Sequence, residues 1–121
     1  MPIERRHVGK RLSELVINRA SGTVYLAGQV AANTTADITG QATQVLAQID
    51  ALLAEAGTDK TQILSTTIYL PDMKDFPAFN AVWDGWVVPG HAPARATVRA
   101  DLVAAEYKVE VQVVAATAHG A

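Results

Sequence analysis

The chain has 121 residues, the length of one domain with one core, and 50% of them are hydrophobic, which is enough to fill that core. The formal net charge is -2 and no run of Lys or Arg could follow a phosphate backbone, which argues against nucleic acid as a partner. There is no Cys, which excludes disulfides, a thiol nucleophile and zinc sites built on thiolates.

Three short strands are predicted near the start of the chain, over residues 3–8, 15–18 and 23–29. The Ser21-Gly22 pair is a hairpin signal, so the second and third strands should be antiparallel neighbours. Gly28 falls inside the third strand, where a glycine costs packing and order. It therefore indicates either a bulge or a close approach of a ligand to the backbone.

An amphipathic helix is predicted next, between Asp37, a good N-cap, and Gly57, a good residue for the position after a helix end. Apolar side chains recur at three- and four-residue steps from Ile38 to Ala56, which is the period of one helix face. The side chains expected on the opposite, polar face are Gln41, Gln44, Gln48 and Glu55.

The β-branched run over residues 64–70 predicts a strand that Pro71 ends, and Asp72 is the expected cap of a second helix. The spacing of the aromatic residues along this helix puts them on one face. They are Phe76, Phe79, Trp83 and Trp86.

Two more strands close the chain, over residues 95–100 and 108–116, and the first of them begins after Pro93, which cannot donate to a sheet. The order βββαβαββ predicts a single α+β domain over residues 1–121. Its architecture would be a two-layer mixed β-sheet with both helices on one face.

Alternation along the strands predicts which side chains face the helices. Leu64 and Val98 are expected on the helix-covered face, whereas Arg95, Thr97 and Glu110 are expected together on the open face. That open face would mix aromatic, hydroxyl and charged groups, which indicates a surface shared with another subunit. A guanidinium fixed by its strand is also a good receptor for a small carboxylate, because its planar fork makes two parallel bonds.

Neither a metal site nor a membrane segment is expected. His7, His91 and His119 are isolated, with no carboxylate or second His at ligand spacing. No apolar run approaches the roughly 20 residues that cross a bilayer, and the amino terminus lacks the apolar core of a signal peptide. A cytoplasmic protein without a membrane partner is therefore expected.

Six short stretches resemble one known family. They are Ala27-Gly28-Gln29, Ala54-Glu55-Ala56-Gly57, Ser65-Thr66-Thr67-Ile68-Tyr69-Leu70, Asp75-Phe76 with Asn80, Pro93-Ala94-Arg95 and Lys108-Val109-Glu110-Val111. The family is RidA, also called YjgF or reactive intermediate deaminase, and the resemblance covers nearly the whole chain. It implies a chorismate-mutase-like homotrimer with ligand sites in clefts between subunits. It also implies an imine deaminase that hydrolyses 2-iminoacids, which are small carboxylates, to 2-oxoacids and ammonia without metal or organic cofactor.

The resemblance also assigns roles by position. Arg95 matches the family's carboxylate-binding arginine and Glu110 its acid near the attacking water. Gly28 matches a glycine whose backbone faces the ligand. The remaining positions that the resemblance places at the substrate are Glu14, Ala27, Asn80, Trp83, Pro93 and Thr97.

Three of these positions depart from the family pattern: Glu14 replaces a Tyr, Ala27 a Ser and Thr97 a Cys. If Glu14 lies at the cleft, it would repel the substrate carboxylate by about 1 kcal/mol or more and favour a cationic or hydrogen-bond-donating side chain. These departures should therefore change the preferred substrate more than the type of reaction.

Simpler interpretations stay open. Arg95 could form a structural ion pair, and Glu110 could pair with Lys108 or Arg99 across the sheet. The alternative function is a ligand-binding or regulatory trimer that keeps the arginine pocket but has little turnover.

Overall fold

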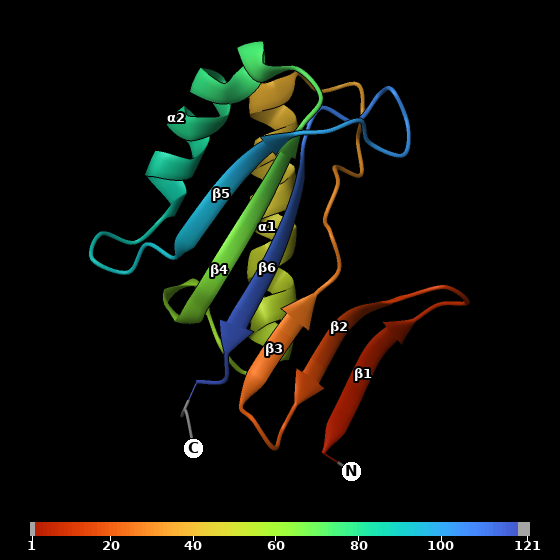
Figure 1. Ribbon diagram of the computed structural model, residues 1–121, viewed down its shortest axis with the longest axis vertical. Coiled ribbons are helices and arrows are strands. Elements are labelled where there is room, and N and C mark those ends of the chain that lie inside the picture. The colour runs from red at the N-terminus through yellow and green to blue at the C-terminus, as the bar shows by residue number, and fades with distance from the viewer. Residues whose placement is uncertain (1, 119–121) are drawn as a thin grey trace.

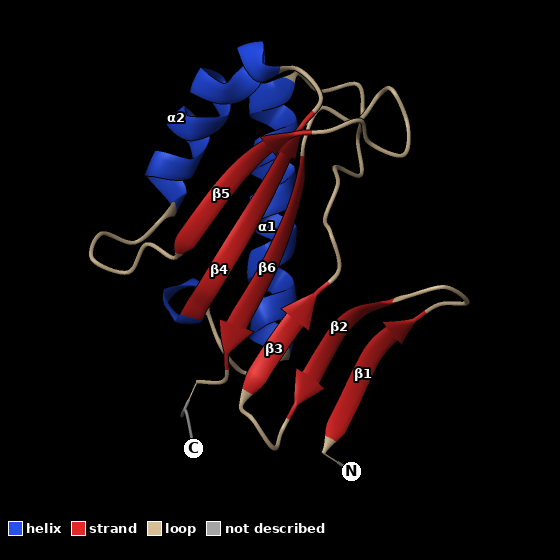
Figure 2. Cartoon of the chain, viewed as in Figure 1, coloured by secondary structure: helices blue, strands red, loops and turns tan. Residues whose placement is uncertain are grey.

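The computed structural model describes residues 2–118 and has two layers, a six-stranded mixed sheet and two α-helices on one of its faces (Figures 1 and 2). This confirms the predicted α+β class and element order. The strands are β1 (Ile3–Val8), β2 (Ser13–Asn18), β3 (Thr23–Leu26), β4 (Ile63–Leu70), β5 (Ala94–Arg99) and β6 (Glu110–Ala116). The helices are α1 (Ile38–Glu55) and α2 (Phe76–Trp86), with short 3-10 turns η1 (Lys60–Gln62) and η2 (Met73–Asp75).

The strands are arranged in the order β1-β2-β3-β6-β4-β5, and every neighbouring pair is antiparallel except β4 and β5. A parallel pair needs a crossover, and α2 supplies it between β4 and β5. β5 is the last strand in this order, so it is an edge strand, and it lies next to α2 (Figure 1). β6, the last strand in the sequence, lies in the middle of the sheet between β3 and β4.

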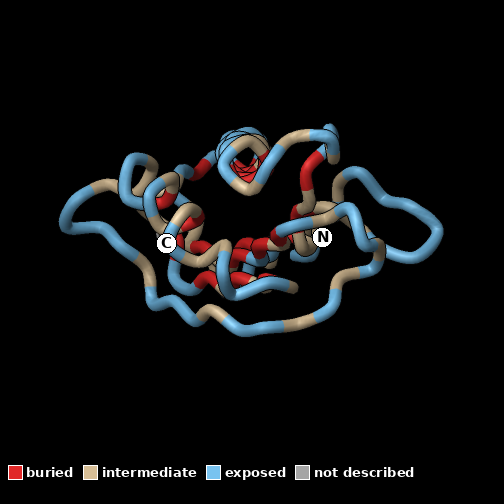
Figure 3. Tube along the Cα trace, turned by 90° about the horizontal axis from the view of Figure 1, so that it is seen from above, coloured by how far each residue is buried: buried red, intermediate tan, exposed pale blue. Residues whose placement is uncertain are grey.

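The core lies between the sheet and the helices, where the buried segments gather when the molecule is seen from above (Figure 3). α1 contributes Val45, Leu46, Ile49 and Leu53, which repeat at helical spacing and are at most 1% exposed. Both predicted ends of α1 are confirmed. The Asp37 carboxylate accepts a hydrogen bond of 2.9 Å from the Gly40 amide, and Gly57 has a φ of +76°.

Gln41 is fully buried, so its predicted place on the polar face of α1 is wrong. Its amide nitrogen donates to the carbonyls of Thr34, Ala36 and Glu106 at 3.1 to 3.3 Å, and its amide oxygen accepts from the Lys108 amide at 2.9 Å. A buried amide with these partners ties two loops to the helix. The bond to Lys108 also explains why β6 begins at Glu110 and not at residue 108.

Leu64 is 52% exposed, so its predicted place on the helix-covered face is also wrong. Between the pairs Ile63↔Ala115 and Ser65↔Val114, β4 advances two residues and β6 only one, so Leu64 is the extra residue of a β-bulge. The bulge turns Ile63 inward, where it is 5% exposed. At the other end of β4, Asp72 caps the short turn η2, and α2 begins only at Phe76.

Replacing Gln41 by Ala should lower the free energy of unfolding by about 2 kcal/mol or more, because it leaves the Lys108 amide and three carbonyls without their buried partner. Gln44→Ala is the matched control. This glutamine also bonds the preceding loop, through both backbone groups of Asn33, but it does so at the surface, where water can replace it. Urea unfolding at fixed protein concentration measures both, and equal losses would contradict this account of the buried amide.

Candidate functional site

Arg95 lies on the helix-covered face of the sheet, so its predicted place on the open face is wrong. In the parallel β4–β5 pair, Thr66 is in register with Arg95 and Ile68 with Thr97. Register partners point to the same face of a sheet, and Thr66 and Ile68 are buried under the helices. Arg95 and Thr97 therefore point toward α2, and Val98, the partner of Tyr69, points to the open face.

Two rings of α2 explain this orientation. The Arg95 guanidinium carbon is 5.1 Å from the centre of the Trp83 ring and 5.9 Å from that of Phe76. A guanidinium stacks well on aromatic faces, so an arginine can occupy a position that alternation alone would give to an aliphatic residue. Within residues 2–118 Arg95 forms no ion pair, so its fork is available to a ligand.

Asn80 faces the same space as Arg95. It comes four residues after Phe76 and three before Trp83, so all three lie on one face of α2. In the described part of the chain, three buried side-chain atoms have no hydrogen-bond partner: Thr66 Oγ1, Asn80 Oδ1 and Thr97 Oγ1. A buried polar atom without a partner ordinarily lowers the free energy of unfolding by about 1–3 kcal/mol.

These residues form one group, which we call the arginine cluster: Thr66, Phe76, Asn80, Trp83, Arg95 and Thr97. Pro93 directly precedes β5, as predicted. The cluster unites Arg95, Asn80, Trp83 and Thr97 from the predicted site. Sequence reasoning missed Thr66, although a hydroxyl residue that shares one face of its strand with the apolar residues Ile68 and Leu70 was an available signal.

Glu110 lies on the opposite face of the sheet. It is in register with Tyr69 and alternates with Val109 and Val111, which are fully buried under the helices. Its carboxylate is close to the backbone of Gly28, because a Cβ added to that glycine would clash with Glu110 Oε2. Glu110 and Gly28 therefore form a second group, the glutamate group, which one chain cannot bring to the side of Arg95.

Gly28 also lies at a bulge. Between Tyr25↔Val114 and Gln29↔Val111, the β3 side advances four residues and β6 only three. Of the two explanations that the sequence left open for Gly28, the structure shows the bulge, and the approach of a ligand to this backbone stays a prediction. The bulge also ends β3 at Leu26, before the predicted residue 29.

Glu14 lies apart from the arginine cluster. Its carboxylate accepts from the Gln29 amide at 3.0 Å, and it lines a hollow of about 470 Å³ next to α1, together with His7 and Glu55. Three strands separate its strand β2 from β5, which is about 19 Å at the usual strand spacing. Ala27 lies beside it, donating its backbone amide to the Glu14 carbonyl at 3.0 Å.

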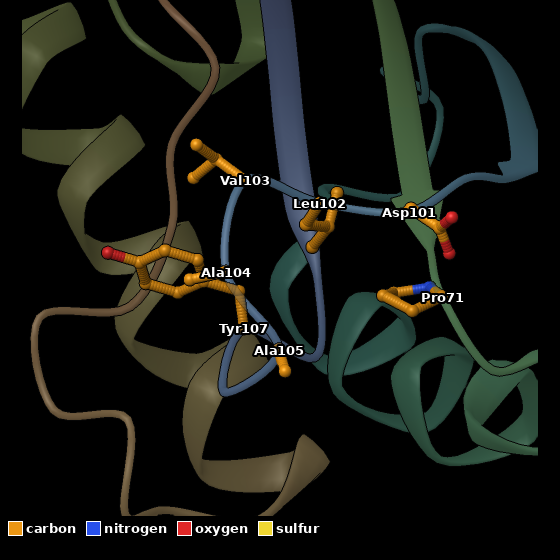
Figure 4. Close-up of a pocket in the computed structure, with 7 residues that line it drawn as sticks. All are labelled: Pro71, Asp101, Leu102, Val103, Ala104, Ala105 and Tyr107. Atoms are coloured by element: carbon orange, nitrogen blue, oxygen red, sulfur yellow. The ribbon is translucent and has the colours of Figure 1, made fainter.

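A further hollow of about 360 Å³ lies under the loop between β5 and β6 (Figure 4). Its two groups capable of proton transfer, Asp101 and Tyr107, lie on opposite sides of the loop, and its other lining residues are apolar. Residues 2–118 hold no group of three or more His, Asp or Glu side chains placed to bind a metal, and His119 lies outside them. No helix in this part of the chain has the length and apolar character to span a membrane.

Comparisons with known proteins agree on one family. A model of the family described as Endoribonuclease L-PSP matches residues 5–117. RutC family protein YoaB of Escherichia coli (strain K12) is 47% identical over 116 residues, which cover 96% of this chain and 99% of that protein.

Two solved structures agree with this. NMB1025 of Neisseria meningitidis, described as a member of the YjgF protein family, has a TM-score of 0.92 and 42% identity, and the match covers 97% of this chain and 96% of that one. A putative translation initiation inhibitor of Salmonella typhimurium has a TM-score of 0.87 and 45% identity, with 95% and 97% of the two chains covered. This chain therefore belongs to the RidA family, whose members are also named YjgF and RutC.

Proposed function

We propose that the protein hydrolyses reactive 2-iminoacids to 2-oxoacids and ammonia. The observation that carries this proposal is Arg95: a guanidinium stacked on two rings, without an ion pair in residues 2–118, beside buried polar atoms that lack partners. Such a site fits a small ligand that brings both a carboxylate and hydrogen-bonding groups.

The arginine cluster matches the two polar ends of a 2-iminoacid. The fork of Arg95 binds the carboxylate through two charge-assisted hydrogen bonds, and the rings of Phe76 and Trp83 hold the guanidinium in place. The free Asn80 Oδ1 accepts a hydrogen bond from the imine N–H. Holding both ends fixes the imine carbon between them for attack.

Glu110 acts from a second copy of the chain. It is the carboxylate that the family resemblance assigns to the attacking water, yet it lies on the sheet face opposite Arg95. A homotrimer that packs the open face of one chain against the β5 edge of the next joins the two groups. Tyr25, Leu64 and Val98 are 46%, 52% and 40% exposed, which suits a surface that another subunit covers.

The reaction then needs one proton-transfer group. Glu110 takes a proton from water as its oxygen bonds to the imine carbon, and the C=N electron pair moves to nitrogen, giving a carbinolamine. Glu110 then passes this proton to that nitrogen. It next takes the hydroxyl proton of the carbinolamine, so that the oxygen electron pair forms the C=O bond of the 2-oxoacid as the C–N bond breaks and ammonia leaves. A protonated imine is already electrophilic, so positioning together with a general base worth roughly 10²–10⁴-fold in rate suffices without a cofactor.

The second candidate function is ligand binding with little turnover. It is favoured by Ala27 and Glu14, which provide no hydroxyl where the family resemblance expects Ser and Tyr. Glu14 is held by Gln29, so it does not replace those groups within its own chain. Timed 2-oxoacid release, with an amino-acid oxidase supplying fresh imine, separates the two functions, because catalytic amounts of a pure binder cannot accelerate it.

In this assay Arg95→Ala should lower kcat/KM at least tenfold, because a charge-assisted pair with the carboxylate contributes about 1.5–3 kcal/mol. Arg99→Ala is the matched control, since Arg99 lies four residues on in the same strand and on the same face. The melting temperature should change little for both variants, because both side chains are exposed. Full activity of Arg95→Ala, or its unfolding, would make the arginine structural.

Co-expression of Arg95→Ala with Glu110→Gln tests the shared site. Each variant alone should be inactive. In mixed trimers, about a quarter of the sites combine an intact arginine from one copy with an intact glutamate from its neighbour, so about a quarter of wild-type activity should return. If the two residues acted within one chain, mixing would restore nothing. Sedimentation of the wild-type protein as a monomer at micromolar concentration would contradict the assembly directly.

A further inference from the structure

Thr66 has no role in the proposed reaction, yet its surroundings are those of a binding group. The residue is 2% exposed, its hydroxyl has no partner in residues 2–118, and it is in register with Arg95 on the same face. Thr97, two residues after Arg95 on that face, has a second unpartnered hydroxyl. Two buried hydroxyls thus remain after Arg95 and Asn80 have been assigned to the carboxylate and the imine.

A structural threonine in this protein looks different. Thr58 is also buried, at 7% exposure, and its hydroxyl donates to the Ala116 carbonyl at 2.8 Å. Buried polar groups normally find such partners within the fold. The unpaired atoms of the described chain all lie in the arginine cluster, which indicates that a ligand, and not the fold, supplies their partner.

The chemistry of that partner follows from the two hydroxyls. Each hydroxyl both donates and accepts, so a ligand hydroxyl or carboxamide, which does the same, can pair with both. An aliphatic side chain would leave both hydroxyls unpaired.

We propose that Thr66 and Thr97 form a side-chain subsite, and that the substrates are 2-iminoacids whose side chain bears a hydroxyl or a carboxamide. This inference rests on the proposed function only in taking Arg95 as the carboxylate receptor. In residues 2–118 the two hydroxyls are buried and have no partner, so a ligand hydroxyl gains hydrogen bonds there without first displacing protein partners. The gain should be about tenfold in affinity.

The test compares two 2-oxoacids of similar size, hydroxypyruvate and 2-oxobutanoate, which differ in a hydroxyl against a methyl group. Calorimetry measures their dissociation constants with wild type, Thr66→Val and Thr66→Ser. Wild type should bind hydroxypyruvate about tenfold more tightly, Thr66→Val should bind the two ligands equally, and Thr66→Ser, which keeps the hydroxyl, should retain the preference.

Thermal unfolding supplies a second readout and Thr58→Val a matched control. Thr66→Val should be at least as stable as wild type, because it removes a hydroxyl that has no partner in the described chain. Thr58→Val should be less stable and keep the ligand preference, because it breaks a bond within the fold. A loss of stability in Thr66→Val as large as that in Thr58→Val would show that the fold itself uses the Thr66 hydroxyl, and would overturn the proposal.

The binding outcomes separate the subsite from the reaction. Equal binding of both ligands by wild type, or an unchanged preference in Thr66→Val, overturns the subsite and leaves the deaminase proposal standing. Preferential hydroxypyruvate binding by a protein that hydrolyses no imine supports the subsite and overturns the deaminase. Wild type that binds neither ligand overturns both.

Discussion

The contact of the Arg95 guanidinium with the rings of Phe76 and Trp83 is the interaction on which the rest of the site depends. It exists because β4 and β5 are parallel, so that α2 must cross between them and lie against the edge strand. The rings hold the guanidinium without neutralising it, whereas a carboxylate partner would occupy its fork. Within residues 2–118 this arginine of β5 therefore has no anionic partner, and it lies beside buried polar atoms that lack hydrogen-bond partners.

The second constraint is the sheet itself. Helices cover one face only, and the register of β6 against β4 fixes Glu110 on the other face, where its carboxylate lies against the backbone of Gly28. In the proposed mechanism a single chain therefore holds two incomplete halves of a site. The proposed trimer would join these halves by packing the open face of one copy against the edge of the next, and it would cover the exposed apolar side chains of the open face.

The sequence predicted the elements well because hydrophobic period, caps and proline positions are local signals, as Asp37, Gly57 and Pro93 illustrate. It did not predict the faces of β5, because no local signal tells an edge strand which face a helix will cover, and an arginine stacked on rings reverses the usual pattern. The bulge at Leu64 shifted the alternation by one residue. Buried Gln41 and unpaired Thr66 depend on partners distant in the sequence, so period alone could not identify them.

A crystal structure of the assembled protein soaked with a stable 2-oxoacid would show whether Arg95 and Glu110 of different copies share one site. We expect the ligand between two copies, with its carboxylate on the guanidinium of Arg95 and with Glu110 of the neighbouring copy near the 2-oxo carbon. A carboxylate bound away from Arg95, or a ligand whose site lies within one chain and excludes Glu110 of any neighbour, would contradict this expectation.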